Sequence, residues 1–181
     1  GLHRILYKCP KCGAENRMEG KGIHLTCHAC EKQWTMDEYG QLSAKEGETE
    51  YPHIPDWYRW QRECVRKELE EGTYCLDTDV DIAVQVNLDG VCMIGEGHLK
   101  HDLDGFYLTG ADGKLDYRQS PVHSHTLYSD YYWYEIGDVI GIGDNEFSYF
   151  CFPKGEVSVT KARLATEELY KMKKRKKEKN G

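Results

Sequence analysis

The sequence predicts a fold of the α+β class, mainly β, in which a small N-terminal ribbon, a connecting helix and an antiparallel β domain closed by a C-terminal helix follow one another. Three patterns predict this order. Two Cys-x-x-Cys motifs lie within the first 30 residues, an amphipathic helical pattern follows Pro55, and apolar residues alternate with polar ones from Tyr74 to about Val159. With 181 residues, the chain is long enough for one medium domain or two small ones.

The ribbon is predicted from Cys9 and Cys12, which Cys27 and Cys30 follow at a short distance in the sequence. Two Cys-x-x-Cys turns at this separation are typical of a structural zinc site, because each turn supplies two thiolates of the tetrahedron. The other four cysteines are isolated, so two disulfides or four buried thiols are the less favoured interpretation, and free thiols fit a reducing cytoplasm. We therefore expect one Zn²⁺ bound by all four cysteines, with no open position for chemistry.

The predicted zinc ribbon covers residues 1–42. Short strands are expected around the two motifs, over residues 3–8, 22–27 and 32–36. Trp34 should cover the small core beside the metal, and residues 39–42 should end the ribbon. His24 and His28 are possible substitute ligands, but four cysteines already complete the ligand set, so both are expected to lie outside it.

A linker and an amphipathic helix are predicted over residues 43–72. Residues 43–53 are polar and rich in turn formers, and Pro55 occupies a first-turn position that tolerates proline. The helix should run from Trp57 to Glu71 and end at Gly72. Its apolar residues fall on one half of the circumference, which predicts packing against a core; they are Trp57, Tyr58, Trp60, Cys64, Val65 and Leu69.

The segment 73–159 is predicted to be an antiparallel β-barrel or sandwich, because short alternating stretches are separated by turn signals. The strand candidates are residues 80–87, 95–102, 106–109, 114–118, 135–143 and 146–152, with part of 123–134 extended. The turns are expected at 88–90, 103–105, 112–113 and 144–145.

A final helix and a basic tail are predicted over residues 160–181, with Thr160 as the N-cap. Ala162, Ala165, Leu169 and Met172 form its apolar stripe. An antiparallel barrel closed by one C-terminal helix is the outline of the pleckstrin-homology (PH) and GRAM-like group, and the hairpin at residues 97–109 resembles the opening hairpins of GRAM-type domains.

One motif suggests acyl-transfer chemistry but matches poorly. His125 and Asp130 form a His-x-x-x-x-Asp sequence, in which the carboxylate would orient a histidine base, and Phe152–Gly155 reads Phe-Pro-Lys-Gly. In glycerolipid acyltransferases the second motif is Phe-Pro-Glu-Gly, lies much further along the chain and belongs to an α/β domain. We therefore expect no catalytic residue in this chain.

A second group of polar residues, His98, His101, Asp102 and Asp104, contains possible metal ligands. In a strand, His98 and His101 point to opposite faces, and the two aspartates belong to an ordinary turn. This group is therefore expected to be part of a surface hairpin.

The charge is distributed unevenly along the chain. The net charge is −7, but residues 171–181 carry seven basic groups and one acidic group, so the first 170 residues sum to −13. An acidic body argues against nucleic-acid binding. The tail is a candidate for contact with the phosphates of nucleic acid or of lipid head groups at an anionic membrane surface, and the alternative is a solvated, frayed helix end. Its basic residues include Lys171, Lys173, Lys174, Arg175, Lys176 and Lys177.

Several longer strings resemble the C-terminal region of Firmicute-type 1-acyl-sn-glycerol-3-phosphate acyltransferases of the PlsC type. The strings are residues 1–15, 52–58, 62–66, 128–139 and 151–155. The resemblance implies that an acyltransferase domain precedes this region in the same chain and carries the catalytic His and Asp. Because the chain begins at Gly1 and not at Met, we also expect it to be part of a longer protein.

These observations favour a non-catalytic accessory module that places or regulates an upstream acyltransferase domain, in the cytoplasm and at the inner face of the membrane. A nucleic-acid-binding zinc ribbon is the alternative. The acids Glu15, Glu19, Glu31, Asp37 and Glu38 roughly balance the bases around the ribbon, which disfavours it. A third interpretation makes the chain itself an enzyme through His125 and Asp130.

Overall fold

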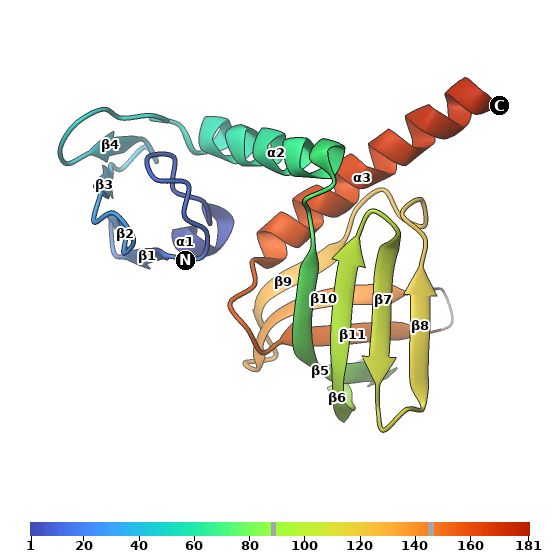
Figure 1. Ribbon diagram of the computed structural model, residues 1–181. Coiled ribbons are helices and arrows are strands. Elements are labelled where there is room, and N and C mark those ends of the chain that lie inside the picture. The colour runs from blue at the N-terminus through green and yellow to red at the C-terminus, as the bar shows by residue number, and fades with distance from the viewer. Residues whose placement is uncertain (88–89, 145–146) are drawn as a thin grey trace. The chain divides into compact units, whose positions relative to one another are not determined.

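The computed structural model describes residues 1–87, 90–144 and 147–181, and the chain divides into two compact units, Gly1–Cys64 and Val65–Gly181 (Figure 1). The predicted class is confirmed: the structure is α+β and mainly β, with antiparallel sheets, a cysteine cluster near the N-terminus and a C-terminal helix. The two units are described separately below.

The first unit is organised around a four-stranded antiparallel sheet with the strand order β1-β2-β3-β4. The strands are β1 (Met18–Lys21), β2 (His24–Cys27), β3 (Gln33–Met36) and β4 (Leu42–Ala44). β2 and β3 coincide with expected strands, whereas β1 was not predicted. β4 begins at the last residue of the predicted ribbon and runs into the segment predicted as linker, where Gln41 also bridges to His53.

The strand predicted over residues 3–8 is wrong, because the chain instead forms a short helix, α1 (Leu2–Ile5). The N–H of Leu6 donates to the carbonyl of Leu2 at 2.9 Å, which closes one helical turn. Leu2 and Leu6 are four residues apart, so the turn places both against the core of the unit. Over only six residues, a strand and a single helical turn can produce the same spacing of apolar residues, so the sequence pattern did not distinguish them.

A compact core surrounds two of the cysteines. Trp34 is fully buried, as predicted, and packs edge-to-face on Trp57 at 5.0 Å between ring centroids. Cys9 and Cys27 belong to the same core cluster. Trp57 comes from helix α2 (Ile54–Glu71), which ends at Gly72 with φ +73°, so the predicted glycine stop is confirmed.

The second unit contains a seven-stranded antiparallel sheet with the order β8-β7-β6-β5-β11-β10-β9. The strands are β5 (Leu76–Asn87), β6 (Gly90–Asp102), β7 (Gly105–Gly110), β8 (Leu115–Gln119), β9 (Tyr128–Trp133), β10 (Gly137–Gly143) and β11 (Ser148–Pro153). In the described residues, the edge strands β8 and β9 do not pair with each other, so the predicted barrel is not closed. The predicted turns at 88–90 and 144–145 fall partly on residues 88–89 and 145, which lie outside the described residues.

Helix α3 (Val159–Asn180) follows the sheet and begins one residue before the predicted cap. Ser158 is the N-cap, because its backbone is extended and its side chain accepts a hydrogen bond from the N–H of Lys161. Thr160 is already helical and buried, and its hydroxyl contacts that of Tyr131. The predicted stripe is confirmed at Ala162, Ala165 and Leu169, which are all buried.

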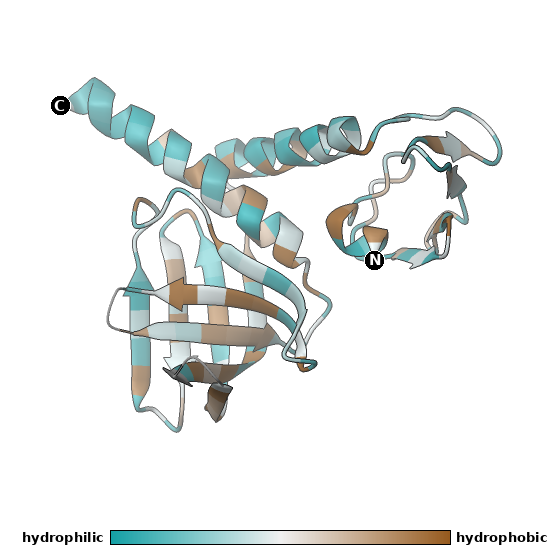
Figure 2. Cartoon of the chain, turned by 180° about the vertical axis from the view of Figure 1, so that it is seen from behind, coloured by the Kyte–Doolittle hydropathy of each residue, from teal (hydrophilic) through white to brown (hydrophobic). Residues whose placement is uncertain are grey.

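The C-terminal part of α3 is hydrophilic along its length (Figure 2). It stays helical to Asn180, and residues 174–181 are exposed. No helix in the described parts of the chain combines the length and the apolar character that crossing a membrane requires.

Candidate metal centre

The four predicted zinc ligands meet in one cluster. The Sγ atoms of Cys9, Cys12, Cys27 and Cys30 all lie within 4.8 Å of one another. The Sγ atoms of Cys9 and Cys30 are 3.7 Å apart, as are those of Cys12 and Cys27. Four sulfurs at ~2.3 Å from one ion form a tetrahedron with edges of about 3.8 Å, whereas a disulfide bond measures ~2.05 Å. The geometry is therefore compatible with a bound metal ion, and all four cysteines are free.

Both cysteine turns have the same backbone conformation. The residue after the second cysteine has positive φ in each, +77° at Gly13 and +64° at Glu31. Its N–H donates to the carbonyl of the first cysteine, at 2.9 Å to Cys9 and 2.7 Å to Cys27. Glycine adopts this backbone region without strain at Gly13, whereas Glu31 adopts it with a side chain present.

The electrostatics of the cluster favour a cation. Burial raises the pKa of the Cys9 and Cys27 thiols. At Cys12 burial also acts to raise the pKa, but hydrogen bonds, including one from the N–H of Ala14, outweigh it and the pKa is lowered. Thiolates are the metal-binding form, and four of them in contact repel one another unless a positive ion lies between them.

The two histidines near the cluster do not contribute to it. In the described residues, the four cysteines are the only group of His, Cys, Asp or Glu side chains arranged to hold a metal ion. His24 is exposed on β2. The Nε2 of His28 lies 2.6 Å from the carboxylate of Glu19, and this side chain is also exposed.

One supporting residue was missed in the sequence. Gln61 is fully buried, and its amide donates to the carbonyl of Ile5 at 2.9 Å and accepts the N–H of Lys8 at 3.0 Å. The indole N–H of Trp57 donates to the carbonyl of Lys8 at 2.9 Å. Helix α2 therefore fixes the backbone that leads directly into Cys9. A signal was present, because Gln61 lies four residues after Trp57 and hence on the apolar face of the helix.

The structure does not bring the possible catalytic pair together. His125 and Asp130 are both exposed, and no hydrogen bond or ion pair joins them in the described residues. His125 lies edge-to-face with Tyr170, and Asp130 accepts the N–H of Tyr131. Lys154 of the Phe-Pro-Lys-Gly sequence forms ion pairs with Asp81 and Glu96.

The histidines of the β6–β7 hairpin lie in opposite environments. His98 is partly exposed and contacts the carboxylates of Asp77 and Asp79, and hydrogen bonds to Asp79 and then Asp77 raise its pKa. His101 is 1% exposed, stacks on Phe106 and bonds to the hydroxyl of Tyr74. The hairpin is confirmed, but His101 belongs to the interior and not to the surface.

No protein-family model, curated protein or solved structure matches this chain.

Proposed function

We propose that the first unit is a zinc ribbon whose Zn²⁺ has a structural role. The close cluster of the four sulfurs, which all lie within 4.8 Å of one another, carries this proposal. Zinc is favoured over other ions because four thiolates from paired Cys-x-x-Cys turns form a soft, closed tetrahedral ligand set. All four positions are filled by protein, so the ion would hold the turns together and would not act on a substrate.

Elemental analysis and X-ray absorption spectroscopy test the metal directly. We expect one zinc per chain, coordinated by four sulfurs at about 2.3 Å. Cys12→Ser should lower the zinc content, whereas Cys75→Ser, which changes an equally exposed cysteine outside the cluster, should leave it at one. Iron in place of zinc, or sulfurs joined in disulfides, would contradict the proposal.

We further propose that the chain is a non-catalytic accessory module of a PlsC-type lipid acyltransferase and places the catalytic domain at the membrane. The β domain supports this through its outline, since a seven-stranded antiparallel sheet followed by one C-terminal helix fits the PH and GRAM-like group. The specific observation in its favour is the basic end of α3, where consecutive exposed residues 174–177 are all Lys or Arg. Each such residue near an anionic bilayer gains about 1 kcal/mol.

Co-sedimentation with vesicles tests the basic helix end. Replacing Lys174, Arg175, Lys176 and Lys177 with Gln preserves helix propensity and should weaken binding to anionic vesicles by about tenfold or more at low salt. The matched control replaces four exposed lysines elsewhere, Lys11, Lys21, Lys45 and Lys114, with Gln and so changes the net charge equally.

Equal binding of the two variants would show that the helix end has no particular role. Salt-dependent binding of single-stranded RNA by the first unit, in place of vesicle binding, would favour the alternative of a nucleic-acid-binding zinc ribbon.

A further inference from the structure

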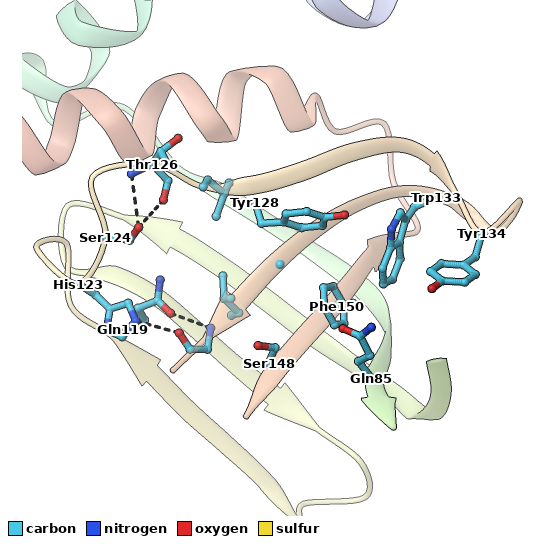
Figure 3. A pocket seen from close by; sticks show the side chains of 14 residues that line it. Gln85, Gln119, His123, Ser124, Thr126, Tyr128, Trp133, Tyr134, Ser148 and Phe150 are labelled. Atoms are coloured by element: carbon cyan, nitrogen blue, oxygen red, sulfur yellow. Dashed lines mark hydrogen bonds between the residues drawn. The ribbon is translucent and has the colours of Figure 1, made fainter. Parts of the chain in front are cut away.

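A cavity of about 640 Å³ lies in the second unit, at the segment that joins β8 to β9 and at strands β5, β9, β10 and β11 (Figure 3). This volume is in the range of small-molecule binding sites. The cavity is separate from the cysteine cluster and from the basic end of α3, so neither proposed function uses it.

Two glycines of β10 form the floor of the cavity. A Cβ on Gly141 would lie 2.8 Å from the ring of Tyr128, and a Cβ on Gly143 would lie 2.0 Å from the carbonyl oxygen of Phe147. Gly143 is held at both ends, because its N–H donates to Gln119 at 3.0 Å and its carbonyl lies 2.8 Å from Nε2 of His123. The backbone at Gly143 is therefore fixed by two side chains that also line the cavity.

Aromatic rings form one wall. Trp133 packs on Phe150 with 4.5 Å between ring centroids, and Tyr134 meets Trp133 edge-on at 4.6 Å. Tyr128 stands perpendicular to both Trp133 and Phe150. Tyr128 and Tyr134 are each 48% exposed, so this packed wall still presents ring surface to a ligand.

Apart from His123, the polar side chains that line the cavity in the described residues are amide, hydroxyl and indole groups. Of the described residues that line the cavity, none is Asp, Glu, Lys or Arg, although 30% of the chain is charged. Gln85 and Ser148 point into the cavity beside Phe150, and neither side chain forms a hydrogen bond with another described residue. The oxygen of the Gln119 amide accepts from Gly143 and from Tyr117, and its NH₂ group has no partner in the described parts of the chain.

We propose that this cavity binds a neutral saccharide unit. An aromatic wall matches the C–H face of a sugar ring, while amide and hydroxyl groups match its hydroxyl groups, which both donate and accept. A charged ligand would lose hydration on entry and would find no Asp, Glu, Lys or Arg among the described residues of the lining. A lipid chain would offer no hydrogen bond to the Gln85 side chain or to the NH₂ group of Gln119.

Saturation-transfer difference NMR on the full chain tests the proposal with a fixed panel of probes, namely glucose, galactose, mannose, N-acetylglucosamine, maltose and cellobiose. We expect transfer to at least one of them, and weaker binding of glucose 6-phosphate than of glucose. Gln85→Ala and Tyr134→Ala alter exposed side chains and should each weaken binding roughly five- to tenfold, which corresponds to the loss of one net contact. Tyr39→Ala, at an 86% exposed position in the first unit, should have no effect.

Three results would overturn the proposal. They are the absence of transfer to every saccharide of the panel, binding that is unchanged in both cavity variants, and binding of adenosine that is tighter than that of any saccharide.

Discussion

Removal of the metal is expected to unfold the first unit and to leave the second unit folded. Cys9 and Cys27 are part of the hydrophobic core that also contains Trp34 and Trp57, so an ion bound by the four cysteines would hold together the same segments as the core. A unit of this size buries little apolar surface by itself. Structural zinc contributes an apparent binding free energy of about 10–16 kcal/mol in small zinc domains, which exceeds the whole stability of most domains of this size.

Tryptophan fluorescence and amide NMR measure the two units separately. Trp34, Trp57 and Trp60 belong to the first unit and only Trp133 to the second, so chelation should shift the emission strongly to the red. The amide signals of β5–β11 should remain dispersed. Cys12→Ser should reproduce the effect of the chelator, and Cys92→Ser, at another exposed thiol, should behave like the unchanged chain.

Unchanged fluorescence after chelation would mean that the fold of the first unit does not depend on a metal bound by the four cysteines. Simultaneous loss of the β5–β11 signals would mean that the second unit depends on the first.

Features that depend on neighbouring residues could be predicted from the sequence. The paired Cys-x-x-Cys turns supply all four sulfurs of the cluster, and Gly72 ends α2, because a short motif or a single backbone angle decides each of them. The alternation in residues 80–87 and 135–143 likewise gave β5 and β10 to within a few residues. Asp112 and Gly113 form the predicted turn between β7 and β8.

Features that depend on distant partners were missed. β1 contains Met18-Glu-Gly-Lys21, which has no intrinsic strand preference, and it is extended because it pairs with β2. Closure of the sheet depends on whether β8 meets β9, and the local pattern of either strand does not determine this. Ser158 and Thr160 are both residue types that cap helices, and the extended backbone at Ser158 shows which of them does so here. The role of Gln61 depends on the backbone of Ile5 and Lys8 that faces α2, which the sequence does not place there.

Acid is expected to destabilise the β domain, because His101 is buried in its interior. Burial lowers the pKa of His101 to about 3, whereas an unfolded chain holds this histidine near its ordinary value of 6.5. Below pH 6.5 the unfolded state therefore binds a proton that the folded state excludes. Stability therefore falls as the pH falls. Between pH 6.5 and pH 3, His101 should lower the free energy of unfolding by up to about 1.4 kcal/mol for each unit of decrease in pH.

Denaturant unfolding of the second unit between pH 7 and pH 4, followed by the amide signals of β5–β7, measures this slope. His101→Gln removes the titrating group and keeps a partner for Tyr74, so the variant should lose stability at pH 7 but its stability should depend much less on pH than that of the unchanged chain.

His98→Gln is the matched control on the same strand and should have the opposite effect on the pH dependence, which should become steeper. Asp79 and Asp77 raise the pKa of His98, so the stability that it contributes is present at low pH and is lost as the pH rises through that raised value. If His101→Gln left the pH dependence unchanged, another buried group would have to carry the acid sensitivity.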